Sequence, residues 1–301
     1  MGFGGYSHDA HVALTAARST AKVSEVFSQR GHCHEQMRPF GGKLRESRDS
    51  KDHPKSVGVI FALDVSGSMG EIPGRLATKT LPSFMKAMLD AGVADPQVLF
   101  MGIGNAIGDM APLQIGQFES NDKLMDQWLT RIFLEAGGGG GDECYELAMY
   151  FAARHTAMDC LQKRKRRGYL FITGDENPNP FVYKDQVKRL IGDPLEADIP
   201  IRSIIEETKK SFELFYLIPD GLRGQQVGAP WRKLLGERVI VMDKPDDTSV
   251  VAAELLGPYL DGAGALPTED AFELRERVGQ AAREAFGPPR FVELATPAWR
   301  S

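Results

Sequence analysis

The chain contains 301 residues, of which 42% are hydrophobic and 26% charged, a composition typical of globular proteins that excludes wholesale disorder. Its 36 Lys and Arg residues against 41 Asp and Glu residues give a formal net charge of −5, so the overall charge favours neither nucleic acid nor an anionic membrane. The longest apolar run, at residues 59–63, is far shorter than the roughly 20 residues that span a bilayer, and the amino-terminal sequence lacks the pattern of a secretory signal.

The first half of the chain contains a polar extension followed by the start of an α/β domain. Residues 1–54 are predicted to be a polar amino-terminal extension. Residues 56–65 (SVGVIFALDV), almost all apolar, are typical of a strand buried on both faces of a parallel sheet. A helix is predicted at 74–91, then strands at 97–104 and 113–118. Only about eight residues separate these two strands, too few for a parallel crossover, so we predict an antiparallel hairpin.

The second half alternates helices with strands. Helices are predicted at 122–135, 143–162, 183–191, 201–210, 230–235 and 248–259, and strands at 168–173, 212–218 and 238–242. This alternation predicts an α/β fold over residues 55–262: a doubly wound, mostly parallel sheet with one antiparallel edge hairpin. Residues 263–301 are predicted to form a carboxy-terminal helical extension, because Thr268 can cap a helix that Gly287 and two prolines end.

Oxygen-bearing side chains gather where the first buried strand ends. Asp64, Ser66 and Ser68 read D-V-S-G-S, and Asp175 follows the strand at 168–173. Ligands of open α/β sheets bind beyond the carboxyl ends of strands, and oxygen side chains at alternate loop positions can converge on a hard cation such as Mg²⁺. The alternative is a purely structural loop, in which a serine caps the next helix and Asp64 accepts hydrogen bonds from loop amides.

Two of these segments resemble the von Willebrand factor A family. Residues 59–70 (VIFALDVSGSMG) resemble the family's first motif, whose D-x-S-x-S signature forms a metal-ion-dependent adhesion site. Residues 171–176 (FITGDE) are similar to its later strand and aspartate loop, and the order of predicted elements over 55–262 also agrees. The resemblance implies a bacterial-type intracellular member.

The resemblance also implies how an ion is held. Ser66 and Ser68 would bind Mg²⁺ directly, with Mn²⁺ or Ca²⁺ as alternatives, while Asp64 and Asp175 act mainly through bound water. One coordination position would stay open for an oxygen of a partner protein, usually a carboxylate.

The function implied is a non-enzymatic adaptor or scaffold that binds another protein. Met69, Glu176 and Asn177 would contact that partner beside the ion. Such family members often work beside an ATPase or within a multi-protein complex, and no membrane contact is expected.

Two departures from the family pattern concern the ion. Gly174 stands as an extra residue between the strand and Asp175, and the middle loop (GGGGGDECYE) lacks the family's threonine. Asp142 or Glu143 is the plausible replacement. A third carboxylate would hold the ion more tightly and would weaken its attraction for an acidic partner.

Three further hypotheses remain open. The first is a Mg²⁺-dependent phosphatase with Asp64 as phosphoryl acceptor, although Ser66 stands where that chemistry needs an acid–base aspartate. The second is a nucleic-acid-associated protein that uses the basic run at 163–167 (KRKRR), which we expect instead to be a solvated cap on the opposite side of the domain. The third is a zinc site or a solvated polar arm formed by His8, His11, His32, Cys33, His34 and His53.

The cysteine content bears on the compartment. Three cysteines, Cys33, Cys144 and Cys160, are too few for a disulfide scaffold. We therefore expect a cytoplasmic protein with reduced thiols.

Overall fold

The computed structural model of the chain describes residues 5–18, 20–70, 72–75, 81–90, 93, 95–135 and 143–242. The predictions for Asp142, for the helix at 248–259 and for the carboxy-terminal extension at 263–301 lie outside these residues.

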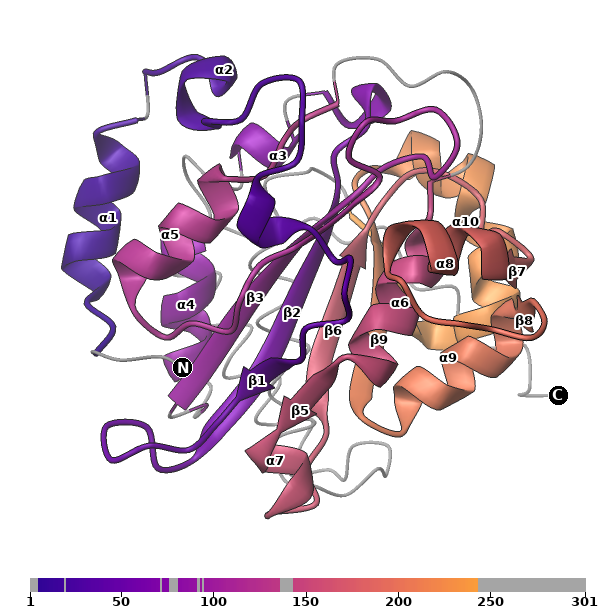
Figure 1. The fold of residues 1–301 in the computed structure, drawn as a ribbon. Helices are drawn as coiled ribbons and strands as arrows, with labels where there is room; N and C mark the ends of the chain where they lie inside the picture. The colour runs from indigo at the N-terminus through magenta and orange to yellow at the C-terminus, as the bar shows by residue number, and fades with distance from the viewer. Residues whose placement is uncertain are drawn as a thin grey trace, which may run out of the picture.

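A six-stranded sheet forms the centre of the described part of the chain (Figure 1). Its strands are β2 (Ser56–Asp64), β3 (Asp95–Ile103), β4 (Leu113–Ile115), β6 (Gly168–Thr173), β9 (Phe212–Ile218) and β10 (Val239–Val241). They lie in the order β10-β9-β6-β2-β3-β4, and all neighbours are parallel except β3 and β4, which are antiparallel. The predicted doubly wound, mostly parallel sheet with one antiparallel edge hairpin is confirmed.

Helices cover both faces of this sheet, as Figure 1 shows. One face packs against α4 (Leu81–Asp90) and α5 (Asp122–Thr130), and α1 (His8–Ala16) contacts both helices. The other face packs against α6 (Tyr145–Arg154), α8 (Lys184–Leu190), α9 (Ile201–Lys209) and α10 (Gly221–Leu235). The shorter elements are α2 (Val23–Val26), η1 (Glu35–Met37), β1 (Arg45–Ser47), η2 (Gly67–Met69), α3 (Ile72–Arg75), β5 (Thr156–Met158), α7 (Asp159–Gln162), β7 (Phe181–Val182), β8 (Ile199–Pro200) and η4 (Gly236–Arg238).

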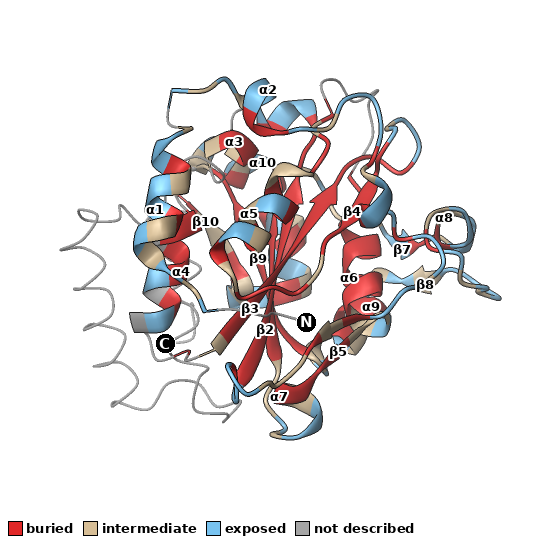
Figure 2. Cartoon of the chain, turned by 60° about the vertical axis from the view of Figure 1, so that its left-hand side comes forward, coloured by how far each residue is buried: buried red, intermediate tan, exposed pale blue. Residues whose placement is uncertain are grey.

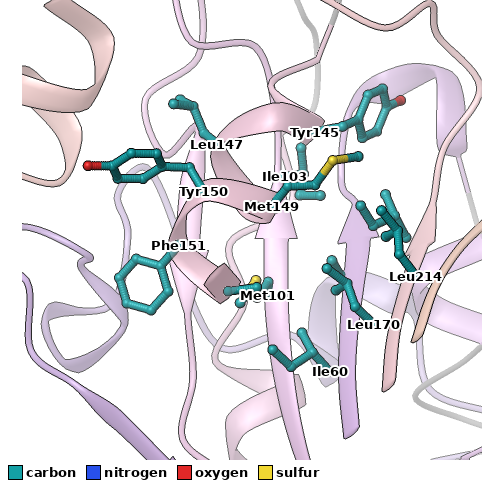
Figure 3. Close-up of a cluster of buried hydrophobic side chains, with 14 of the residues drawn as sticks. Ile60, Met101, Ile103, Tyr145, Leu147, Met149, Tyr150, Phe151, Leu170 and Leu214 are labelled. Atoms are coloured by element: carbon teal, nitrogen blue, oxygen red, sulfur yellow. The ribbon is translucent and has the colours of Figure 1, made fainter. Parts of the chain in front are cut away.

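Alternate side chains of β2 supply the cores on the two faces. Phe61 and Leu63 pack in the cluster that includes α4 and α5, whereas Ile60 and Ala62 pack in the cluster that includes α6 (Figure 3). Every residue of β2 is buried, as Figure 2 shows for the centre of the sheet. Burial on both faces explains why this strand is an almost continuous apolar run in the sequence.

The amino-terminal segment is joined to the sheet domain by a separate two-stranded parallel sheet. In it β1 pairs with β5, from Arg45 opposite Thr156 to Ser47 opposite Met158. Arg45 is 2% exposed, and its guanidinium donates to the carbonyl oxygens of Gly116 (2.8 Å) and Ile115 (3.4 Å). These contacts satisfy a buried cation with backbone oxygens at the end of β4.

The pairing of β1 with β5 explains why the single helix predicted at 143–162 is wrong. The helix α6 ends at Arg154, residues 156–158 extend as β5, and the short α7 follows. Helical periodicity in this segment carries no information about a partner strand about 110 residues earlier in the chain.

The helix predicted at 230–235 begins much earlier, at Gly221. It starts there because the Asp220 side chain accepts a hydrogen bond from the backbone N–H of Arg223 (2.9 Å) and caps the first turn. In the portion of the chain that the structure describes, no helix is both long enough and apolar enough to cross a membrane.

Candidate metal-binding site

Two loops meet at the carboxyl ends of neighbouring strands. β2 ends at Asp64 and continues into the turn that carries Ser66 and Ser68, and β6 ends at Thr173, two residues before Asp175. Leu63 pairs with Thr173 across the two strands, so both loops leave the sheet at the same place. The parallel arrangement of β2 and β6 thus brings together the residues that the sequence placed far apart.

Four side chains from these loops form a continuous chain of oxygen contacts. The hydroxyl of Ser66 donates to Asp64 Oδ1 (2.6 Å), and the hydroxyl of Ser68 donates to Asp175 Oδ1 (2.9 Å). The two hydroxyl oxygens are themselves 2.9 Å apart. The structure therefore brings the predicted residues Asp64, Ser66, Ser68 and Asp175 into direct contact.

The hydrogen atoms available to this chain are too few for its contacts. It has three oxygen–oxygen contacts, but each serine supplies a single hydroxyl hydrogen. When both hydrogens point to the carboxylates, the contact between Ser66 Oγ and Ser68 Oγ has no hydrogen to bridge it. A cation bound by these oxygens would resolve the mismatch, and so would a proton on Asp64, because burial raises the pKa of that group to about 7. Two hydroxyls and two carboxylates are also the hard oxygen donors that Mg²⁺ accepts, so the residues fit this ion.

Tyr145, which the sequence reasoning missed, completes the environment of Asp64. Its hydroxyl donates to Asp64 Oδ2 (2.6 Å) and accepts from the backbone N–H of Glu176 (3.3 Å). A Cβ atom at Gly174 would lie 2.4 Å from that hydroxyl oxygen, so the extra glycine makes room for the tyrosine. Tyr145 thus supplies a hydroxyl to Asp64 from the start of α6. An aromatic residue four positions after the last glycine of the glycine-rich run was the available signal.

Two further aromatic residues fix the Asp175 loop. The ring of Tyr216 stacks on Trp231 with centroids 3.9 Å apart, and both rings meet Tyr145 edge to face. Trp231 Nε1 donates to the carbonyl oxygen of Glu176 (2.9 Å), and the Tyr216 hydroxyl donates to the same oxygen (3.3 Å). The loop that carries Asp175 is thus held by buried, rigid side chains.

Arg223, at the start of α10, is the second residue that the sequence reasoning missed. Its Nε donates to Asp175 Oδ2 (2.7 Å), and its Nη2 donates to the carbonyl oxygen of Ser68 (2.6 Å). Its Nη1 contacts Asp220 Oδ2. The helix start was predicted too late in the chain, so no sequence signal placed this arginine near Asp175.

Burial raises the pKa of two carboxyl groups at the site. Asp64 is fully buried, and this burial, with a smaller contribution from Asp175, raises its pKa to about 7 despite the hydrogen bonds from Ser66 and Tyr145. Burial, followed by the charges of Asp64, Glu176 and Asp175, raises the pKa of Glu143 to about 8. A divalent cation nearby would favour the charged forms of both groups.

The remaining predicted site residues lie in different environments. Glu143 is 5% exposed, and its Oε2 has no hydrogen-bond partner among the residues described. Met69 is 1% exposed, so the side chain that we predicted to contact a partner does not lie on the surface. Glu176 is partly buried and Asn177 is exposed. Over the described ranges, no three His, Cys, Asp or Glu side chains are arranged to hold a metal, so any ion here depends on the serine hydroxyls.

The zinc hypothesis is not supported by the surroundings of the amino-terminal histidines, whose ring nitrogens lie near groups that are not metal ligands of a shared site. His11 Nδ1 lies 3.1 Å from the Tyr6 hydroxyl, and His34 Nδ1 accepts from the backbone N–H of Gln36 (3.2 Å). His53 Nε2 lies 2.9 Å from the Ser120 hydroxyl. Within the described ranges these side chains form no metal-binding cluster with Cys33.

The basic run at 163–167 is largely paired with acidic side chains. Lys163 contacts Asp159 (2.7 Å), Arg164 contacts Asp49 (2.7 Å), and Arg167 forms an ion pair with Glu213. These pairs leave less positive charge for a phosphate backbone than the sequence of the run suggests.

The solved structures that resemble this chain do so at low sequence identity and with low TM-scores. No family model matches the chain, and no curated protein matches it. A pilus adhesin, SpaC, from Lactobacillus rhamnosus GG is 12% identical with a TM-score of 0.45, over 77% of this chain and 32% of the adhesin. The vWF domain of a type V pilus tip protein from Porphyromonas gingivalis is 11% identical with a TM-score of 0.42, over 71% of this chain and 98% of that domain. A proximal thread matrix protein from the mussel byssus is 10% identical with a TM-score of 0.40, over 72% of this chain and 49% of that protein. The chain therefore spans half or less of two of these structures.

Proposed function

We propose that this chain contains a von Willebrand factor A-like domain that binds Mg²⁺ through Asp64, Ser66, Ser68 and Asp175 and uses the ion to bind a partner protein. The observation that carries the proposal is the convergence of two carboxylates and two serine hydroxyls in one continuous chain of oxygen contacts. We further propose that the module is a non-enzymatic adaptor, with Mn²⁺ or Ca²⁺ as alternative ions.

The exposure of the site residues supports binding of a partner. Ser68 and Asn177 are exposed, whereas Asp64, Ser66 and Asp175 are buried behind them. When bound, Mg²⁺ supplies a hard, positively charged contact for an oxygen atom, and a partner carboxylate is the chemical group that suits it. The buried side chains would hold the ion, and the exposed ones would border the partner.

The phosphatase alternative has less support. Asp64 is fully buried, and both of its carboxylate oxygens accept hydrogen bonds, from Ser66 and from Tyr145. A phosphoryl-accepting carboxylate must reach its substrate directly, which this environment disfavours.

Three buried, unpaired cysteines support a reducing compartment as the working environment. We therefore propose a cytoplasmic protein that works within a multi-protein assembly, such as one built around an ATPase.

Isothermal titration with Mg²⁺ tests the metal-binding step. We expect the wild-type chain to bind the ion and Ser66→Ala to bind it at least about tenfold more weakly, because a ligand is removed. Ser203→Ala, at an exposed serine of α9, is the matched control and should bind like the wild type. Equal affinity in the wild type and Ser66→Ala would refute the assignment of the site.

Affinity capture with and without Mg²⁺ tests the partner-binding step. A protein partner should be retained by the wild-type chain in Mg²⁺, released by EDTA, and lost with Ser66→Ala. Retention that is unaffected by EDTA would show that partners bind elsewhere on the molecule.

A further inference from the structure

Arg223 connects the candidate metal site to the start of α10. Its guanidinium donates to Asp175 on the β6 loop and to the carbonyl oxygen of Ser68 on the β2 loop. The Arg223 side chain is 28% exposed, whereas that of Asp175 is only 5% exposed. A cation of this chain therefore already contacts one of the carboxylates that a divalent ion would need.

Both oxygens of the Asp175 carboxylate accept a hydrogen bond in this arrangement. Oδ1 accepts from the Ser68 hydroxyl and Oδ2 accepts from Arg223. A guanidinium paired with a carboxylate cancels much of the negative charge that attracts Mg²⁺, and two cations sharing one carboxylate repel each other.

Asp220 gives the guanidinium a second acidic partner on its own helix. The Asp220 side chain caps α10 by accepting from the backbone N–H of Arg223, and it also contacts Nη1 of the same residue. If the contact with Asp175 is broken, Arg223 keeps this partner and is not left as an unpaired charge. Exchange between two arrangements is therefore feasible without unfolding the helix.

We propose that Arg223 is a built-in competitor of the divalent ion: it neutralises Asp175 in the metal-free protein and leaves it when the ion binds. This inference rests on the proposed metal-binding function. Ion loading then frees a guanidinium at the rim of the site, next to the exposed Leu222. A freed guanidinium can bind a carboxylate through two parallel hydrogen bonds, so an acidic partner segment would be favoured only after the ion is loaded.

A supporting role for Arg223 would have the opposite effect on affinity. If the arginine instead orients Asp175 for the ion, removing it weakens metal binding, as is usual for groups that position a ligand. If it competes, removing it strengthens metal binding. Whether Mg²⁺ affinity rises or falls when Arg223 is replaced therefore separates the two roles.

The test is isothermal titration of the full chain with Mg²⁺ in the wild type, Arg223→Met and Arg223→Gln. We expect both variants to bind Mg²⁺ about tenfold more tightly, a coupling typical of linked sites. Arg223→Gln keeps a hydrogen-bond donor near Asp175 and carries the test if Arg223→Met does not fold. Thermal unfolding gives an independent readout. In EDTA both variants should melt at a lower temperature than the wild type. Mg²⁺ should raise their melting temperatures by more than it raises that of the wild type.

Arg154→Met is the matched control for loss of a paired arginine. Arg154 forms two hydrogen bonds with Glu207 (2.7 and 2.9 Å) at the end of α6 remote from Tyr145, and its loss should change Mg²⁺ affinity less than twofold. Unchanged or weaker Mg²⁺ binding in the Arg223 variants would overturn the competition while leaving the metal site standing. Absence of binding in the wild type and in both variants would overturn the metal site itself, and the inference with it.

Discussion

Two buried aspartates at opposite ends of the sheet differ in the charge of their neighbours. Asp64, at the carboxyl end of β2, is 0% exposed, and Asp159, at the start of α7 (Figure 1, bottom), is 3% exposed. Asp64 accepts side-chain hydrogen bonds from the neutral hydroxyls of Ser66 and Tyr145. Asp159 accepts from the cations Arg48 (2.9 Å) and Lys163 (2.7 Å) and from the backbone N–H of Asp49 (2.9 Å).

The pKa values of these two groups move in opposite directions as a result. Burial raises the pKa of Asp64 to about 7. Burial also acts to raise the pKa of Asp159, but the hydrogen bonds from Lys163, Asp49 and Arg48 outweigh it and lower the pKa to about 2. Asp159 is thus balanced by cations of the chain itself, and its role is structural. The charged form of Asp64 is disfavoured because neutral hydroxyls alone stabilise it among the side chains described, and a bound cation would favour that form.

The largest expected effect is the loss of stability in Asp159→Asn. The change should lower the free energy of unfolding by about 2 kcal/mol at pH 7, because the charge-assisted hydrogen bonds to a nearly buried group are weakened. Urea unfolding measures it. Glu206→Gln, which weakens a pair with Lys209 on an exposed carboxylate, should cost less than about 0.5 kcal/mol.

The contribution of Asp159 should depend on pH with a definite sign. A carboxyl group with a lowered folded-state pKa stabilises the fold above its ordinary pKa, near 4, and loses this effect as the pH falls toward about 2. The difference in the free energy of unfolding between the wild type and Asp159→Asn should therefore shrink as the pH falls from about 4 to about 2. A difference that stays constant over this range would contradict the charge-based explanation.

A smaller loss is expected for Tyr145→Phe. Without the hydroxyl, Asp64 Oδ2 and the backbone N–H of Glu176 lose a shared partner, at an expected cost of about 1–2 kcal/mol in urea unfolding. Tyr150→Phe is the control on the same helix, because its hydroxyl donates to the more exposed Asp193 (2.7 Å). A larger loss in the control than in Tyr145→Phe would show that the Asp64 environment contributes little to stability.

The smallest effect in metal-free conditions is expected for Asp64→Asn. Because neutral hydroxyls rather than cations donate to the Asp64 side chain in the described part of the chain, stability in EDTA should stay within about 1 kcal/mol of the wild type. Excess Mg²⁺ should then separate the two proteins: at about 100 times the dissociation constant, the wild type gains about 2.7 kcal/mol and the variant gains nothing. Equal stabilisation of both proteins would break the contrast between Asp64 and Asp159.

The sequence was sufficient for the features that depend on local pattern and strand order. The continuous apolar run of β2 identified a central strand, and the D-x-S-x-S turn after it identified Asp64, Ser66 and Ser68. Asp175 followed because a second buried strand ends two residues earlier. Neighbouring parallel strands end at the same edge of a sheet, so the side chains were expected to meet if the two strands were adjacent, and the pairing of β2 with β6 shows that they are.

The features that depend on packing were not accessible from the sequence. Tyr145 and Arg223 reach Asp64 and Asp175 from the first turns of α6 and α10, and no spacing rule links those helices to the D-x-S-x-S turn. The burial of Met69 likewise depends on how the turn folds back onto the domain. The strand β5 was missed because its partner β1 lies about 110 residues away.

The pairing of β1 with β5 cannot form until the ribosome has synthesised both strands. Arg45 is translated long before Thr156, the residue opposite it in the β1–β5 sheet. At about 5–20 residues per second, β1 waits roughly 5–20 s for its partner strand to be synthesised. Throughout that interval β1 lacks its native partner strand, so factors that bind emerging polypeptides should raise the yield of this protein.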